Sequence, residues 1–278
     1  MKKLLSADLY ALRRGKLFWI LLAGAAVFGF LLPGTYLFMF KMIDLLTEQT
    51  GDLFKSEELA SLNGVMNMLK NMMNSDAVLI SAVPFTSGYG LFVTGAVAYY
   101  ASRQFSTGII RNKIIAGHGR TSVFFSVFLS SLMLALPAVI VNLVATAGAS
   151  VLMFGKFQTF GSAELARIFA VTVTIYVVYT AVPVCAAFTF KSVPLTIILS
   201  IVMPTALGAL LSLASAVAGS MPKLIMYVLC AFPSFQTAAL SYIGNSNSFF
   251  ITAVVSDAVI TAALLFGFCR LFKRSDVK

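Results

Sequence analysis

Residues 103–121, RQFSTGIIRNKIIAGHGRT, contain four basic side chains and no acidic one. The basic residues are Arg103, Arg111, Lys113 and Arg120. The segments on either side, residues 77–102 and 121–155, carry no charge at all. The chemistry open to these cations is electrostatic: they can bind phospholipid head groups or a protein partner. A loop this basic between membrane spans is expected on the cytoplasmic side.

Apolar residues recur at helical spacing within the same loop. They are Phe105, Ile109, Ile110 and Ile114. On a helix they form an apolar stripe beside a basic one. Such a helix either lies flat on a membrane or docks into a partner.

One acid, Asp257, is the only charged residue in residues 224–269. An acid inside a membrane span is costly unless it is paired or hydrated. Asp257 therefore either contacts a substrate or proton in a translocation path, or makes a structural hydrogen bond to a Ser or Thr of a neighbouring span or subunit. The sequence leaves both interpretations open.

The motif PFTSGYG in residues 84–90, which contains Pro84 and Tyr89, is another candidate for lining a translocation path. Pro and Gly in a spanning helix predict a kink whose freed backbone groups need protein or water partners. A cavity would supply that water. Close helix packing through the small residues explains the motif equally well.

The composition defines the class of protein. Of 278 residues, 59% are hydrophobic and 11% are charged, and the mean hydropathy is +0.94. Soluble domains carry about 25% charged residues, so the chain is predicted to be a multispanning membrane protein. Its net charge of +10 is explained by cytoplasmic loops, and no motif indicates nucleic-acid binding.

Motifs for catalysis or metal binding are missing from the sequence. It contains no GxxxxGK[ST], HExxH or GxSxG motif. The three cysteines, Cys185, Cys230 and Cys269, lie in apolar stretches without metal-ligand spacing and are expected to be small buried residues. The single histidine, His118, is expected to be a solvated loop residue. We therefore expect no catalysis, metal site or cofactor in this chain itself.

The hydrophobic runs predict one transmembrane domain over residues 1–278. Six runs are long enough to cross a bilayer, namely residues 17–40, 77–101, 122–154, 165–190, 193–220 and 248–269. The other segments are an amphipathic interfacial helix, an outer segment, the basic loop, a re-entrant segment and a tail, in residues 1–16, 41–76, 102–121, 224–243 and 270–278. The predicted fold is an all-α integral membrane protein with six transmembrane helices and a re-entrant outer hairpin before the last one.

The distribution of charge predicts the orientation. Most of the 20 basic residues fall at the amino end, in the basic loop and in the tail. Both termini are therefore expected in the cytoplasm. Leu224 to Tyr242, interrupted by Pro233, is expected to enter from outside and turn back, because a seventh span would place the basic tail outside.

The order aromatic, Gly, basic-Asn-basic, Ile-Ile, Gly, Arg in residues 105–120 resembles the coupling-helix region of bacterial permease subunits of type-2 ATP-binding-cassette (ABC) transporters. Gln104 stands where family members more often have an acid, and Ile109 where they more often have Thr. The resemblance extends to the order of spans and to both tails. It implies that the coupling residues are Arg103, Gln104, Phe105, Ile109, Ile110, Arg111, Lys113 and Arg120.

The resemblance also implies the assembly and its task. Two permease chains, this one with a second copy or a close paralogue, would work in the bacterial plasma membrane with two cytoplasmic ATPase subunits, which bind the ATP and Mg. Half-size permeases of this kind resemble exporters of peptides such as lantibiotics and phenol-soluble modulins. A lipid-like substrate is the next expectation. Two alternatives stay open: a non-transporting receptor or immunity protein for a peptide, and a secondary transporter of a hydrophobic compound.

Overall fold

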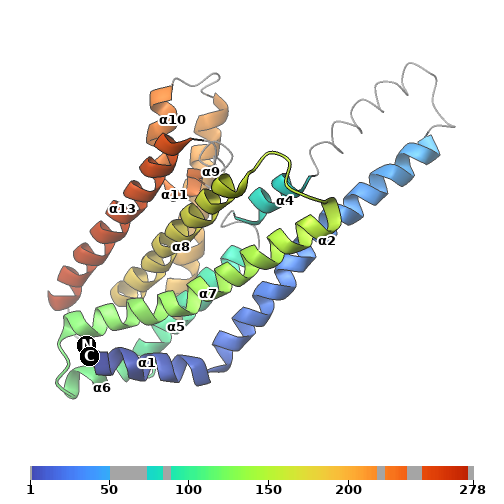
Figure 1. The fold of residues 1–278 in the computed structure, drawn as a ribbon. Helices are drawn as coiled ribbons and strands as arrows, with labels where there is room; N and C mark the ends of the chain where they lie inside the picture. The colour runs from blue at the N-terminus through green and yellow to red at the C-terminus, as the bar shows by residue number, and fades with distance from the viewer. Residues whose placement is uncertain (1, 51–73, 84–88, 218–222, 237–245, 275–278) are drawn as a thin grey trace.

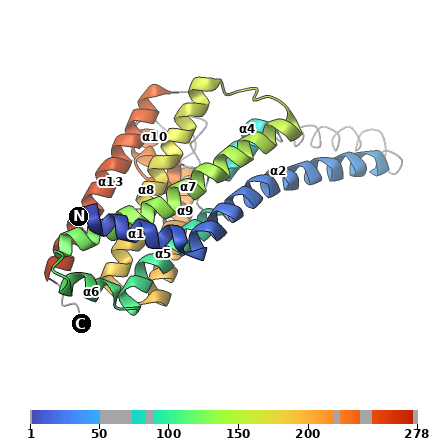
Figure 2. The same ribbon diagram turned by 60° about the horizontal axis from the view of Figure 1, so that its bottom comes forward.

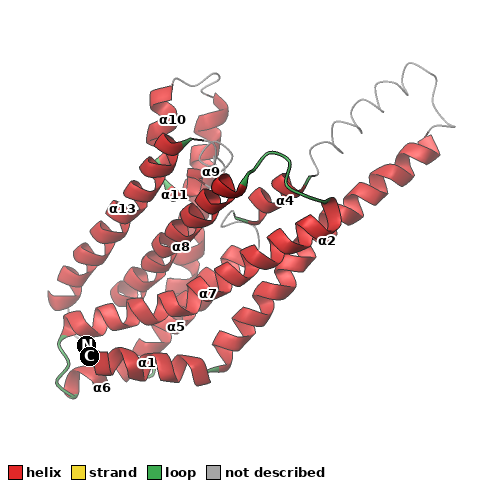
Figure 3. Ribbon diagram, in the orientation of Figure 1, coloured by secondary structure: helices red, strands yellow, loops and turns green. Residues whose placement is uncertain are grey.

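The computed structural model describes residues 2–50, 74–83, 89–217, 223–236 and 246–274. Within these residues all regular secondary structure is helical and no strand occurs (Figure 3). The helices are α1 (Lys2–Arg14), α2 (Lys16–Thr50), α4 (Ser75–Ala82), α5 (Tyr89–Ser106), α6 (Ile109–Ile115), α7 (Arg120–Phe154), α8 (Ser162–Phe190), α9 (Val193–Val217), α10 (Lys223–Cys230), α11 (Pro233–Gln236) and α13 (Asn247–Arg274).

Five helices, α2, α7, α8, α9 and α13, are long and apolar enough to cross a membrane. This agrees with the prediction of a multi-pass membrane protein. The run expected to be the second span is divided between α4 and α5, and residues 84–88 lie outside the described residues. The expected re-entrant segment contains α10 and α11, but its residues 237–243 are also outside them, as are residues 51–73 of the expected outer segment.

The centre of the bundle is formed by α7 and α8 (Figure 1). Helix α7 contacts α1, α2, α4, α5 and α8, while α8 also contacts α5, α9 and α13. Buried hydroxyl groups along α7 and α8 mostly donate to carbonyls of their own helix, as Ser130 does to Val127 and Thr172 to Ile168. Among the described residues of these two helices, Ser131 and Thr146 on α7 are buried hydroxyls without a hydrogen-bond partner.

Helix α2 packs against α7 through a stripe of residues four positions apart, in which Ala25 and Gly29 are the small members. A side chain at Gly29 would meet Ala145 Cβ at 2.5 Å and Asn142 O at 2.9 Å. The two helices can therefore approach this closely only because glycine has no Cβ. The amide of Asn142 donates to Ala25 O at 3.1 Å and reinforces the contact.

Large apolar side chains cover the outward faces of α2, α9 and α13. On α13 the exposed residues recur along one side of the helix, as Ile251, Val255, Val259 and Phe266. Exposed apolar faces of this extent are unfavourable in water and are typical of lipid-facing or interface surfaces.

Helix α1 lies across the ends of the longer helices, as the view in Figure 2 shows. The chain bends between α1 and α2 at Gly15, whose N–H donates to Ala11 O and Leu12 O at 3.0 Å each. Trp19 Nε1 donates to Arg13 O at 3.0 Å across the bend. Leu4 and Leu12 are buried on one side of α1, which matches the amphipathic helix predicted for residues 1–16.

Candidate interaction site at the basic end of the bundle

The basic loop folds into the last turns of α5 and the short helix α6. The sequence pattern predicted one helix carrying both Phe105 and Ile109. The structure differs because Gly108 adopts a left-handed conformation with φ 70°, which glycine adopts without the steric cost that a side chain brings. Helix α5 ends at Ser106, and α6 begins at Ile109 in a new direction. Phe105 therefore belongs to α5 and not to α6.

The faces of α6 differ sharply in exposure. Ile110 is 1% exposed and anchors the helix in the core, whereas Ile109 and Ile115 are 42% and 71% exposed. Arg111 and Asn112 are also exposed. The outward surface of α6, here called the α6 face, is formed by Ile109, Arg111, Asn112 and Ile115. It combines apolar and cationic groups, as the sequence predicted, but Ile110 is not part of it.

Lys113 points inward and joins α6 to α1. Its Nζ lies 2.8 Å from Asp8 Oδ1 and donates to Gln104 Oε1 at 3.0 Å. Ser126 Oγ donates to Asp8 Oδ2 at 2.6 Å. The side chains of Lys113 and Asp8 are 10% and 11% exposed, so this cluster, here called the Asp8 cluster, is largely shielded from water. It connects α1, α5, α6 and α7.

Phe105 also points inward, into a cluster of aromatic rings. Its ring meets Phe188 edge-on with centroids 4.8 Å apart, and Phe188 meets Phe124 and Phe272 in the same way at 4.8 and 4.7 Å. Edge-to-face contacts of this kind add to the free energy of burial. The cluster joins α5, α7, α8 and α13 beneath α6.

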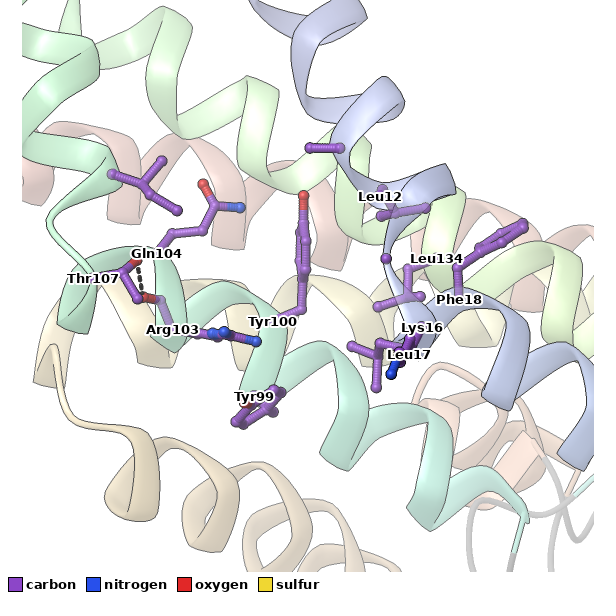
Figure 4. Close-up of a pocket in the computed structure, with 13 residues that line it drawn as sticks. Leu12, Lys16, Leu17, Phe18, Tyr99, Tyr100, Arg103, Gln104, Thr107 and Leu134 are labelled. Atoms are coloured by element: carbon purple, nitrogen blue, oxygen red, sulfur yellow. Dashed lines mark hydrogen bonds between the residues drawn. The ribbon is translucent and has the colours of Figure 1, made fainter.

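The two remaining basic residues of the loop have different surroundings. Arg120, at the start of α7, donates from Nη1 to the carbonyl of Lys273 at 2.8 Å, which joins α7 to the last turn of α13. Arg103 is exposed and lies at the edge of a cavity of 490 Å³ between α1, α2, α5, α6 and α7 (Figure 4). Its guanidinium Cζ lies 5.7 Å from the centre of the Tyr99 ring.

The candidate residues of a translocation path occupy packed positions. Asp257 is 1% exposed; it accepts from Thr174 Oγ1 at 2.7 Å and from Gln236 Nε2 at 3.0 Å. Thr174 is a partner of the kind that the structural interpretation expected, whereas Gln236 was not predicted. Tyr89 is buried and donates from its hydroxyl to Leu21 O at 2.7 Å. Pro84 lies outside the described residues.

Sequence reasoning missed the roles of Asp8 and Ser126. Asp8 stands four residues from both Leu4 and Leu12, so helical periodicity places it in the middle of the buried side of α1. This periodicity was an available signal. Its partners, however, are 105 and 118 positions away in the sequence, and only the fold brings them together.

Among the described residues, no group of three or more His, Cys, Asp or Glu side chains is placed to hold a metal ion. The cysteines Cys185, Cys230 and Cys269 are free and buried, as the sequence predicted. Comparisons of the chain with protein-family models, with curated proteins and with solved structures find no match.

Proposed function

We propose that this chain is the membrane-spanning permease subunit of an ATP-driven ABC exporter in the bacterial plasma membrane. The observation that carries the proposal is the α6 face, where Ile109, Arg111 and Ile115 project from the end of the bundle. A short helix with exposed apolar and basic side chains suits docking into a groove of a cytoplasmic protein. In the proposed assembly that protein is the ATPase subunit, which binds ATP and Mg.

The distribution of charge supports a cytoplasmic position for α6. The start of α1, α6, and the ends of α8 and α13 gather at one end of the bundle (Figure 1). The described basic residues at this end are Lys2, Lys3, Arg13, Arg14, Lys16, Arg103, Arg111, Lys113, Arg120, Lys191, Arg270, Lys273 and Arg274. Such an excess of Lys and Arg is typical of the cytoplasmic side. The proposal therefore has six spans, with α4 and α5 in the second, and both termini inside.

The Asp8 cluster and the aromatic cluster give a route by which α6 would move the spans. In the proposed cycle, two permease chains, this one with a second copy or a close paralogue, bind two ATPase subunits, and closure of the ATPase pair displaces α6. Lys113 would transmit that displacement to α1 through Asp8, and Ile110 would transmit it to the core. The helices would then rock as packed units and change access to a shared cavity.

The proposed substrate is an amphipathic peptide, with a lipid-like molecule as the next candidate. The described parts of α7, α8 and α9 carry few charges and many apolar and hydroxyl side chains. Such surfaces accommodate apolar side chains better than sugars or ions.

The test is to co-express this chain with the ABC ATPase encoded beside it and to purify through a tag on this chain. ATP hydrolysis is then measured with and without amphipathic peptides. Co-purification with peptide-stimulated hydrolysis is the expected result. A chain that purifies alone, while the ATPase is folded and abundant, would contradict the proposal and favour a peptide receptor or a secondary transporter.

A further inference from the structure

The cavity beside Arg103 has apolar walls and a cationic rim. Its volume is 490 Å³, within the range of roughly 300–1,000 Å³ that is usual for small-molecule sites. The apolar side chains come from four helices and include Leu12, Leu17, Phe18, Ile109 and Leu134. Leu12 and Leu134 are buried and form the floor, while Leu17 and Phe18 are partly exposed.

Two cations stand at opposite sides of this cavity. Figure 4 shows Arg103 on α5 and Lys16 at the start of α2, with Tyr100 between them and Tyr99 beside Arg103. Both cations are exposed, and neither has a carboxylate partner among the described residues. Asp8, the acid on the neighbouring helix α1, is already paired with Lys113. The charge of the rim is therefore left uncompensated within the described part of the chain.

The cavity lies at the level where a membrane interface is expected. Tyr99 lines it and is 37% exposed, while Tyr10 and Trp19, which adjoin the lining residues Ala11 and Phe18 in sequence, are 59% and 56% exposed. Tyr and Trp are enriched at the boundary between acyl chains and water. Helix α1 lies across the ends of the spans at the same level (Figure 2), in the manner of an interfacial amphipathic helix.

From this geometry we infer that the cavity between α1, α2, α5, α6 and α7 binds one anionic phospholipid, with an acyl chain against Leu12, Leu17 and Leu134 and the phosphate between Lys16 and Arg103. A soluble anion such as a nucleotide or a sugar phosphate would leave the apolar walls unmatched. A zwitterionic lipid such as phosphatidylcholine also carries a phosphate, but its own ammonium group would offset part of that charge beside Lys16 and Arg103. Because the cavity contacts both α1 and α6, the bound lipid would hold these two helices together.

This inference rests on the membrane orientation given under the proposed function, but it needs no ATPase. The full chain is purified alone in detergent and mixed with phosphatidylglycerol, phosphatidylcholine or inorganic phosphate. Native mass spectrometry then measures how much of each probe is retained. The variants are Lys16→Gln, Arg103→Gln and Leu17→Trp, which fills the apolar wall. Arg14→Gln is the matched control, because Arg14 is an exposed cation of α1 that does not line the cavity.

The expected result is preferential retention of phosphatidylglycerol, weakened roughly fivefold by each of Lys16→Gln and Arg103→Gln. Leu17→Trp should weaken it as well, and Arg14→Gln should not. Equal losses in Arg14→Gln and Arg103→Gln would show diffuse attraction and overturn the inference. Retention that is insensitive to Leu17→Trp, or equal binding of inorganic phosphate, would overturn it in favour of a simple anion site.

Protein quality and the proposed function are assessed separately. Each variant is checked by size-exclusion chromatography and thermal unfolding. If Leu17→Trp does not fold, Leu17→Phe fills less of the same wall and takes its place. A chain that retains phosphatidylglycerol selectively but never binds an ATPase would reject the proposed function alone. A chain that binds the ATPase and shows no lipid preference would reject the lipid site alone.

Discussion

Lys113 Nζ lies 2.8 Å from Asp8 Oδ1, so a largely shielded ion pair joins the amino-terminal helix to α6. The pair is supported on the lysine side by Gln104 and on the acid side by Ser126. Removing one member leaves the other charge poorly solvated and unpaired, whereas removing both members leaves no charge in the site. The pair therefore connects α1 to α6 at the basic end of the bundle.

Asp8→Ala should lower the free energy of unfolding by about 2 kcal/mol, because Lys113 loses its counter-charge in a site with little water. The double variant Asp8→Ala, Lys113→Met should be more stable than the sum of the two single changes predicts. Thermal unfolding of the purified chain in detergent provides the double-mutant cycle. Strictly additive losses would mean that the two side chains do not interact.

Gly29→Ala should destabilise the chain by about 1–3 kcal/mol, because the new Cβ would lie 2.5 Å from Ala145 Cβ and force α2 away from α7. Gly34→Ala is the matched control on the same helix, since no atom lies within 4 Å of the position its Cβ would take. Equal unfolding temperatures for the two variants would show that α2 and α7 do not pack as closely as described.

Asp257→Asn should change stability little, because the amide oxygen can still accept from Gln236 Nε2 while the new N–H donates to Thr174 Oγ1, whose hydroxyl keeps donating to Val171 O. Asp257→Leu should cost about 2 kcal/mol, because Thr174 keeps only its bond to Val171 O and Gln236 Nε2 loses its strongest acceptor and keeps Cys230 O. Unfolding measurements test this structural role. If Asp257→Asn abolishes peptide-stimulated ATP hydrolysis while the chain stays stable and bound to its ATPase, the carboxylate contacts the substrate instead.

Ile109→Asp should abolish association with the ATPase subunit while leaving the unfolding temperature nearly unchanged, because Ile109 is 42% exposed on the α6 face. Ile110→Asp should instead destabilise the chain, because it buries a charge at a position that is 1% exposed. Co-purification and thermal unfolding of both variants separate the two effects. Normal association of a folded Ile109→Asp chain would remove α6 from the docking surface.

Ile115→Cys should react with a membrane-impermeant maleimide only from the cytoplasmic side, and Lys156→Cys only from the outside. Both positions are exposed, and they flank α7, since Ile115 ends α6 before it and Lys156 follows its last residue, Phe154. The unmodified chain is the control, because Cys185, Cys230 and Cys269 are buried. Labelling of Ile115→Cys in intact cells would reverse the proposed orientation.

The long helices could be predicted because an apolar run of about 20 residues has few stable alternatives. The start of α9 at Val193 and the end of α7 at Phe154 fall at the predicted positions. The break at Gly108 was harder to predict, since periodicity continued across it from Phe105 to Ile109. A glycine inside a helical pattern is compatible with either a helix or a turn, and here the left-handed conformation was adopted.

The candidate site was predicted only in part for a similar reason. Composition indicated where cations gather, but it did not indicate which of them point inward. Lys113 and Arg111 are two residues apart and face different surroundings, a difference that depends on α5 and α7 packing against α6 and on Asp8 of α1 pairing with Lys113. Likewise the pairing of Asp257 with Gln236 depends on α11 meeting α13, which no local pattern encodes.

The hydrogen bond from Trp19 to Arg13 O gives the chain an intrinsic reporter. Trp19 is its only tryptophan, and it is held at the bend between α1 and α2 with 56% of its surface exposed. Fluorescence excited at a wavelength that tryptophan absorbs and tyrosine does not therefore arises from that bend alone. Its emission maximum and its quenching by brominated acyl chains would follow the depth and movement of the amino-terminal helix in an unlabelled chain.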